Sequence, residues 1–232
     1  MSFHSLQLIF GTSLLEIRGL NILIDYLPYF MGGALITLGI TALSVSFGMI
    51  IGLFFGLFKL SNNKILYYFS SLYIDLFRGT PLFVQALLFY FGILPAIMGD
   101  VSAFHAAIIV CSLNSGAYIA EIVRAGIQAV DKGQMEAASS LGMNYTQAML
   151  YVILPQAYKV VIPPLINEFI MLLKDTSIMS IIGAAELVQR GRIAYSVTYE
   201  ATWIWGGIAL IYFVMTKVLS ILGAYTERRL DS

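Results

Sequence analysis

The sequence predicts an all-α membrane protein with about five transmembrane helices. Of its 232 residues, 59% are hydrophobic and only 11% are charged, and the mean hydropathy is +0.85. A soluble domain carries roughly a quarter charged residues. One aqueous core cannot bury this much apolar surface, so lipid must solvate part of it. Several apolar stretches reach the roughly 20 residues that a helix needs to cross a bilayer.

The composition argues against several classes of function. The formal net charge is zero, which implies no electrostatic attraction to nucleic acid. The single cysteine, Cys111, cannot form a disulfide within the chain. His4 and His105 stand far apart without neighbouring cysteines or carboxylates, so we expect no metal site. The N-terminus lacks a basic segment and a small-residue cleavage site, so we expect no removed signal peptide.

The expected spans follow from the distribution of charge along the chain. In chain order they are Pro28–Phe58, Ile65–Leu94, Phe104–Val130, Tyr158–Ile182 and Ala201–Tyr225. The first is the clearest, because no charged residue lies between Asp25 and Lys59. In the second, Asp75 and Arg78 interrupt the apolar run, and Pro81 is expected to bend the helix.

Residues 1–27 contain three charged residues and are expected to form an interfacial segment before the first span. Five spans place the two termini on opposite sides of the membrane. Basic residues gather in the first and third connections and in the C-terminal tail, as Lys59, Lys64, Lys132, Lys159, Arg228 and Arg229. The positive-inside rule therefore predicts a cytoplasmic C-terminus and an outer N-terminus. Arg18, Arg190 and Arg192 fall on the outer side and weaken this bias.

The polar stretch EAASSLGMNYTQAMLYVILP connects the third and fourth spans. Good helix formers occupy Glu136–Leu141, and Gly142 is suited to end that helix in a left-handed conformation. Asn144 and Gln147 have the spacing of a capping box that begins a second short helix. Leu154-Pro155 is expected to end it. Such a pair of helices could bind a groove on another protein or rest on the membrane surface.

This stretch resembles the coupling loop of the membrane subunits of ABC importers. The pattern of that loop is E-A-A, three residues, G, nine residues and I-x-L-P. The chain has Glu136-Ala137-Ala138, then Gly142, then Val152-Ile153-Leu154-Pro155, with valine in place of the first isoleucine. Three other stretches are similar to the polar amino-acid permease branch: Phe77–Gln85 (FRGTPLFVQ), Asn114–Ala138 (NSGAYIAEIVRAGIQAVDKGQMEAA) and Leu172–Leu187 (LLKDTSIMSIIGAAEL).

The resemblance implies an importer transmembrane domain over residues 28–230 in the bacterial cytoplasmic membrane. Its coupling loop would be residues 131–155, with contacts to a cytoplasmic ATPase subunit through Glu136, Ala137, Ala138, Gly142, Leu154 and Pro155. An extracytoplasmic binding protein would deliver a polar amino acid, and the permease would pair with a second copy or with a sister permease. ATP would bind the partner subunit, and this chain has no G-x-x-x-x-G-K-[ST] phosphate loop. The chain is therefore expected to be a transport subunit and not an enzyme.

Polar residues within the spans are candidate substrate contacts, because such residues are costly in a bilayer. Glu168, beside Asn167, lies nine residues after Lys159, or about 13–14 Å along a helix. That depth is close to mid-membrane, where importers of several designs bind substrate. Glu168 could bind an amino group or a cationic side chain, or it could form a hydrogen bond across a dimer interface.

The remaining polar residues within the spans allow two interpretations each. Asn114 and Ser115 could donate hydrogen bonds to a substrate carboxylate or could serve helix packing. Thr80 could frame the same cavity, and Asp175 could face it or bond another helix. Two pairs with a spacing of three, Asp75–Arg78 and Glu121–Arg124, are expected to pair along one helix face.

The connection 184–200 is either a solvated segment or a docking surface for the binding protein. Two other functions lack the sequence features that they require. A secondary carrier would show an internal repeat, which the halves lack. An intramembrane enzyme would need a nucleophile and a base, and Cys111 has no suitably placed histidine.

Overall fold

The computed structural model describes the backbone of residues 3–231 and the side chains of residues 18–230, and this part of the chain is helical without strands. The α-helices are α1 (Phe3–Lys59), α2 (Lys64–Gly79), α3 (Leu82–Leu88), α4 (Leu94–Met98), α5 (Ala103–Gln128), α6 (Lys132–Ser140), α7 (Tyr145–Ala148), α8 (Leu154–Asp175), α9 (Leu187–Thr198) and α10 (Ala201–Asp231). Two π-helical turns, η1 (Phe89–Ile93) and η2 (Met149–Ile153), and one 3₁₀ helix, η3 (Thr176–Ile182), join some of them.

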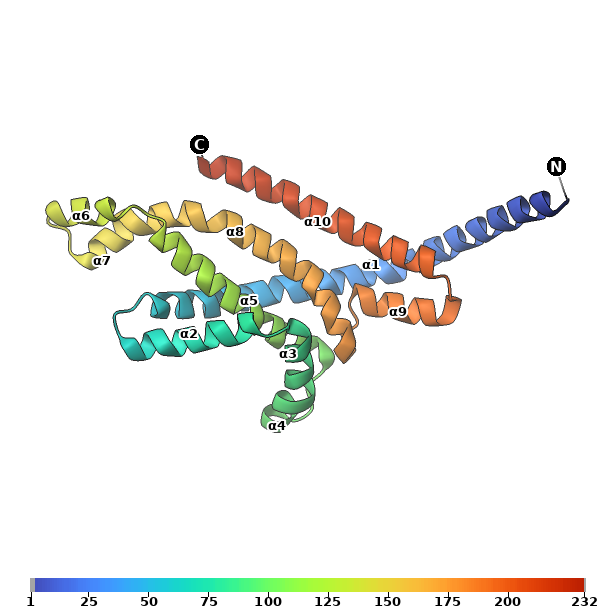
Figure 1. Cartoon of the computed structure of the whole chain (residues 1–232), viewed down its shortest axis with the longest axis horizontal. Helices are drawn as coiled ribbons and strands as arrows, with labels where there is room; N and C mark the ends of the chain where they lie inside the picture. Colours follow the sequence, from blue (N-terminus) through green and yellow to red (C-terminus); the bar gives the residue numbers. More distant parts are fainter. Residues whose placement is uncertain (1–2, 232) are drawn as a thin grey trace.

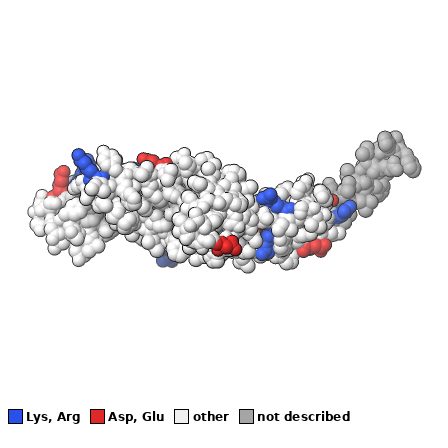
Figure 2. Space-filling model, turned by 90° about the horizontal axis from the view of Figure 1, so that it is seen from below, with Lys and Arg blue, Asp and Glu red and all other residues white. Residues whose placement is uncertain are grey.

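The long helices lie along one axis of an elongated molecule (Figure 1). The helices α6 and α7 form one end, and α9 lies towards the end that holds the N-terminus. Figure 2 shows few charged side chains on the face seen from below, as expected for a surface in contact with lipid.

The number of spans agrees with the sequence prediction. Within residues 18–230, four continuous helical runs are long and apolar enough to cross a membrane: Arg18–Lys59, Ala103–Gln128, Tyr145–Ile182 and Ala201–Leu230. A fifth candidate is the pair Lys64–Gly79 and Leu82–Met98, whose halves meet at 104°. The expected second span is therefore broken, and not merely bent, at Thr80-Pro81.

Helix α1 is longer than a bilayer requires. It has 57 residues, or about 86 Å of helix at 1.5 Å per residue, against a hydrocarbon thickness of about 30 Å. The backbone is helical across residues 27 and 28, where the sequence suggested a change from an interfacial segment to a span. The two segments are therefore one element, and the interfacial position of residues 1–27 stays a prediction.

The two π-helical turns each come directly before a Leu-Pro pair. The Leu94 N–H donates to the Phe89 carbonyl, and the Leu154 N–H donates to the Met149 carbonyl, five residues back in both cases. A proline ring in a regular α-helix collides with the carbonyl four residues earlier, and the wider π turn relieves this collision. The expectation that Leu154-Pro155 ends a helix is therefore wrong. The chain is helical from Tyr145 to Ile182.

Helices α1 and α5 pack closely through glycines. On α1, Gly48, Gly52 and Gly56 are four residues apart and share one face. A Cβ atom on Gly52 would lie 2.6 Å from the Ile119 Cβ and 2.9 Å from the Gly116 carbonyl oxygen. This close approach of two backbones is typical of helix pairs in membranes, and it fixes α5 at the centre of the fold.

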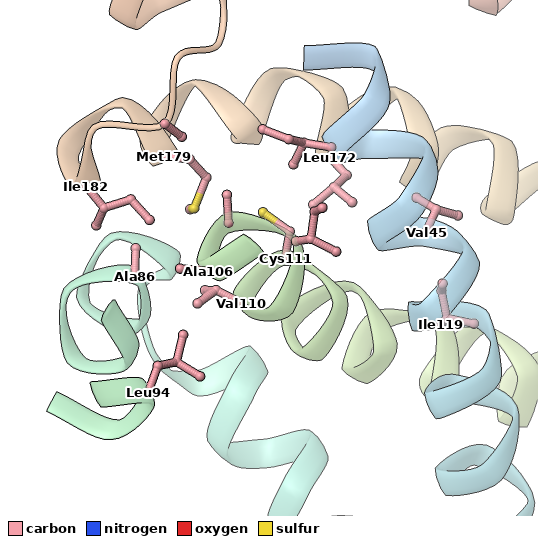
Figure 3. Close-up of a cluster of buried hydrophobic side chains, with 14 of the residues drawn as sticks. Val45, Ala86, Leu94, Ala106, Val110, Cys111, Ile119, Leu172, Met179 and Ile182 are labelled. Atoms are coloured by element: carbon pink, nitrogen blue, oxygen red, sulfur yellow. The ribbon is translucent and has the colours of Figure 1, made fainter. Parts of the chain in front are cut away.

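The largest buried apolar cluster surrounds α5 (Figure 3). Side chains from α1, α3, α4, α5, α8 and η3 contribute to it, and the labelled members are Val45, Ala86, Leu94, Ala106, Val110, Cys111, Ile119, Leu172, Met179 and Ile182. Ala86 and Leu94 belong to the second half of the broken span. Their burial holds that half against α5, so packing fixes the 104° break.

The connection 184–200 contains helix α9. Glu186 is the N-cap of α9: its Oε1 accepts from the Gln189 N–H at 2.7 Å, and its Oε2 accepts from the Val188 N–H at 2.9 Å. Its side chain is fully buried, so the expectation of a solvated connection is wrong at this residue. The free N–H groups of a helix start replace water around the carboxylate.

Candidate functional site

A cavity of about 400 Å³ lies where the break at Thr80-Pro81 meets α5 and α8; we call it the first cavity. Its polar lining residues are Arg78, Thr80, Asn114, Tyr118, Glu168 and Asp175. Thr80, Asn114, Glu168 and Asp175 are four of the sequence-predicted substrate residues. Ser115, a fifth, contacts this group through Glu168.

Glu168 is the most enclosed carboxylate of the first cavity. Its side chain is 7% exposed, and its Oε1 accepts a hydrogen bond from the Ser115 Oγ at 2.8 Å. Asp175 lies seven residues later, two turns along the same face of α8. Among residues 18–230, neither carboxylate is part of an ion pair. Both are therefore open to a positively charged ligand.

Asn114 is held by the broken span. Its Nδ2 donates to the Gln85 Oε1 at 3.0 Å and to the Phe77 carbonyl at 3.3 Å. The Gln85 Nε2 in turn donates to the carbonyl of Phe77 at 2.8 Å and to that of Thr80 at 3.0 Å. Gln85 thus closes the carbonyl end of α2 and sets the shape of the turn at Thr80.

Sequence reasoning missed Gln85 as a member of the site. Gln85 is the last residue of the stretch Phe77–Gln85. Its position shortly after the break at Pro81 could have indicated its role. A buried amide five residues past such a break can bond the carbonyls that the break leaves free. Asn167, by contrast, was predicted as a substrate residue, but its side chain is exposed and does not line the first cavity.

Arg78 supplies the positive charge of the first cavity. Its expected ion pair with Asp75 is absent from residues 18–230, and both side chains are exposed. The guanidinium instead lies over the ring of Tyr118, with its carbon 5.2 Å from the ring centroid. The spacing of three allowed a pair along α2, but Tyr118 on α5 offers Arg78 a second partner that spacing cannot reveal.

The second predicted pair is present. The Arg124 Nε donates to the Glu121 Oε1 at 2.9 Å. The Lys59 Nζ lies 3.4 Å from the other oxygen of Glu121, so this carboxylate joins the end of α1 to α5.

The first cavity brings two carboxylates and one guanidinium together. A small molecule that carries both a positive and a negative group could satisfy both signs of charge. Lys174 lines a separate cavity beside Tyr212, so it and Asp175 face different sides of α8, as their adjacency predicts.

The predicted coupling segment, residues 131–155, has the expected local structure around Gly142 and Asn144. Gly142 adopts a φ of +83° and ends α6. Its N–H donates to the Ser139 carbonyl, and the Met143 N–H donates to that of Ala138, which together form a Schellman motif. Asn144 and Gln147 form the expected capping box at the start of α7.

The predicted coupling residues divide into buried and exposed positions. Ala138 is 3% exposed, whereas Glu136, Ala137, Gly142, Leu154 and Pro155 are exposed. Around them, Leu141 is 84% and Tyr145 is 69% exposed. Leu141 follows α6 and Tyr145 begins α7, and these two helices form one end of the molecule (Figure 1), where a partner could cover the apolar side chains.

No group of three or more histidine, cysteine or acidic side chains suited to a metal ion occurs within the described part of the chain. The His105 Nδ1 lies 2.7 Å from the Ser102 Oγ at the start of α5.

Known proteins resemble the chain over most of its length. Residues 48–232 match the family described as "Binding-protein-dependent transport system inner membrane component". The chain is 40% identical over 210 residues to the arginine transport system permease protein ArtQ of Bacillus subtilis (strain 168), covering 90% of this chain and 95% of that protein. It is 37% identical over 206 residues to the glutamine transport system permease protein GlnP of Escherichia coli (strain K12), covering 88% and 94%.

Solved structures share the fold. One, described as "Crystal structure of an amino acid ABC transporter with histidines", is 48% identical, covers 89% of this chain and 96% of that chain, and has a TM-score of 0.84. A structure of the MetNI methionine ABC transporter in an inward-facing conformation is 22% identical and has a TM-score of 0.79. At this identity the likeness shows a shared fold only.

Proposed function

The chain belongs to the family of binding-protein-dependent transport system inner membrane components, and we propose that it is the permease subunit of an ATP-driven importer of polar amino acids. The names of its relatives support this proposal, because they are described as permeases for arginine and for glutamine. In this proposal the chain works with a cytoplasmic ATPase, an extracytoplasmic binding protein and a second permease. Its C-terminus is cytoplasmic and its N-terminus lies outside.

The first cavity carries the proposal on substrate. Among the side chains that the structure describes, Glu168 and Asp175 form no ion pair, and Arg78 is a basic group on the same cavity. An amino acid presents an ammonium and a carboxylate, which match the two signs of charge. When both carboxylates are ionised the three groups sum to one negative charge, so an amino acid with a cationic side chain is favoured over a neutral one.

The coupling segment carries the proposal on energy. The helices α6 and α7 and the turn between them expose Glu136, Leu141 and Tyr145, and the two helices form one end of the molecule (Figure 1). An ATPase groove that receives these side chains would bury apolar surface and pair one carboxylate. Movement of the ATPase subunits on ATP binding would then move α5 and α8.

The test is transport by the reconstituted complex of permease, ATPase and binding protein in proteoliposomes. We expect uptake of radiolabelled arginine and glutamine to require ATP. Glu168→Gln should reduce arginine uptake at least fivefold more than glutamine uptake. Asp25→Asn, which removes an exposed carboxylate on α1 remote from the cavity, is the matched control.

Two outcomes would contradict the proposal. Uptake that follows an ion gradient at constant ATP would indicate a secondary carrier. Equal loss of arginine and glutamine uptake in Glu168→Gln would remove the preference for cationic substrates.

A further inference from the structure

A second cavity, of about 390 Å³, adjoins the first. Its lining includes Glu121 and Ala125 of α5, Ala129 at the C-terminal cap of α5, and Val160 and Pro164 of α8. Each of these residues lies nearer the coupling segment in its helix than the residues that line the first cavity.

The two cavities follow the same two helix faces. On α5, Tyr118, Glu121 and Ala125 are spaced by three and four residues and share a face. On α8, Pro164 of the second cavity and Glu168 of the first are four residues apart. The two cavities therefore follow one another along α5 and α8, from Asp175 towards the coupling segment.

The residues that both cavities share are Arg78 and Tyr118. The Arg78 guanidinium carbon lies 5.2 Å from the Tyr118 ring centroid, so the two side chains stack where the two cavities meet. Such a contact is worth only about 0.5–2 kcal/mol. An energy of this size favours the stacked arrangement of Arg78 and Tyr118 but allows the two side chains to separate.

We infer that the Arg78–Tyr118 stack is the gate between the first and second cavities. This inference rests on the proposed transport function. Arg78 lies at the carbonyl end of α2, two residues before the break at Thr80-Pro81, so a small rotation at the break moves it relative to α5. A substrate carboxylate in the first cavity offers the guanidinium charge-assisted hydrogen bonds, which are stronger than its contact with the ring. Substrate binding thus favours parting of the stack.

The experiment measures access through the gate with a single thiol. Cys111 is buried and is the chain's only cysteine, so Cys111→Ser provides the background. Ala125→Cys places a reporter in the second cavity. In sealed vesicles that contain the complex, a membrane-impermeant cationic thiol reagent is added to the side on which α9 lies, without ATP.

Tyr118→Ala should raise the labelling rate at least tenfold, because it removes the ring. Tyr118→Phe, the matched control, keeps the ring face and should leave the rate unchanged. Arg78→Met, which keeps the length of the side chain but not its charge, should also raise the rate. Labelling from the opposite side should be equal in all variants and reports that each is folded.

Labelling from the α9 side that is as slow in folded Tyr118→Ala and Arg78→Met as in the parent would overturn the gate. The labelling rate is measured separately from uptake and uses no ATP, so a failure of the gate can be told apart from a failure of the proposed function. If the complex shows the expected labelling pattern but no ATP-driven uptake, the importer function is rejected and the gate is kept. If it shows ATP-driven uptake but no change in labelling between variants, the gate is rejected and the importer function is kept.

Discussion

The phenol of Tyr212 donates a hydrogen bond to the Glu186 Oε2 at 3.1 Å and so joins α10 to the start of α9. The next residue, Leu187, donates its N–H to the Thr37 Oγ1 of α1 at 3.2 Å. Helix α1 and the consecutive helices α9 and α10 thus meet around one carboxyl group that is fully buried.

This carboxyl group predicts how stability depends on pH. Burial raises the pKa of Glu186 from 4.5 to about 7, against the opposing effect of its hydrogen bonds. The folded state therefore binds the proton more tightly than the unfolded state does. The resulting contribution to the free energy of unfolding is fully present below about pH 4.5 and is lost as pH rises through 7. It amounts to about 3 kcal/mol.

We expect the thermal midpoint of the detergent-solubilised protein to decrease as the pH is raised from 5 to 8. In Glu186→Gln the midpoint should depend less on pH. Unfolding is followed by loss of monodisperse protein after heating at each pH. Glu136→Gln, at an exposed carboxylate, should leave the slope as it is. An unchanged slope in Glu186→Gln would contradict the assignment.

Gly52→Ala tests the close contact of α1 and α5. The new methyl would lie 2.6 Å from the Ile119 Cβ, so the helices must separate, at a cost of about 1–3 kcal/mol. Gly39→Ala, on the same helix with nothing within 4 Å of its Cβ position, should instead stabilise by about 0.5–1 kcal/mol. The measurement is the thermal midpoint in detergent, and equal shifts in the two variants would reject the contact.

Glu121→Gln tests the charged junction between α1 and α5. It leaves Lys59 and Arg124 close together without their shared anion, so we expect a loss of about 1–3 kcal/mol. Asp100→Asn, at an exposed residue between α4 and α5, should be neutral. The loss should shrink in 1 M salt as the exposed part of the repulsion is screened. A neutral Glu121→Gln at low salt would contradict this prediction.

Glu136→Ala tests the coupling segment. If the carboxylate pairs with the ATPase, its removal should weaken the complex by about 1.5–3 kcal/mol, or roughly tenfold to 100-fold in Kd. The measurement is titration of detergent-solubilised permease with ATPase subunit. Asp100→Ala is the control, since Asp100 lies outside the coupling segment. Equal affinity of Glu136→Ala and parent would remove Glu136 from the interface.

Local signals in the sequence predicted much of the fold. Long apolar stretches with few charges located the spans, because a charge in lipid is costly. The caps at Gly142 and Asn144 depend on a few neighbouring residues, and both occur as predicted. The continuation of the helix past Pro155 was missed, because the rule that proline ends a helix assumes regular α geometry and the chain adopts a π turn instead.

Contacts between side chains that are far apart in the sequence could not be predicted from local sequence patterns. The spacing of Asp75 and Arg78 indicated a pair, whereas Tyr118, 40 residues after Arg78, lies under the guanidinium. Glu186 looked like part of a charged connection. Only the fold shows that α1 and α10 close over it.

The unbroken helical path from Tyr145 to Ile182 has a mechanical consequence. Glu168 lies 23 residues beyond Tyr145, or about 35 Å along the axis, with no loop between them. A rotation of the exposed start of this path is transmitted to the carboxylate through two places where the regular helical hydrogen bonding is interrupted, the π turn at Met149–Ile153 and the Pro163-Pro164 pair. The exposed start at Tyr145 and the buried carboxylate of Glu168 are parts of one continuous helical path.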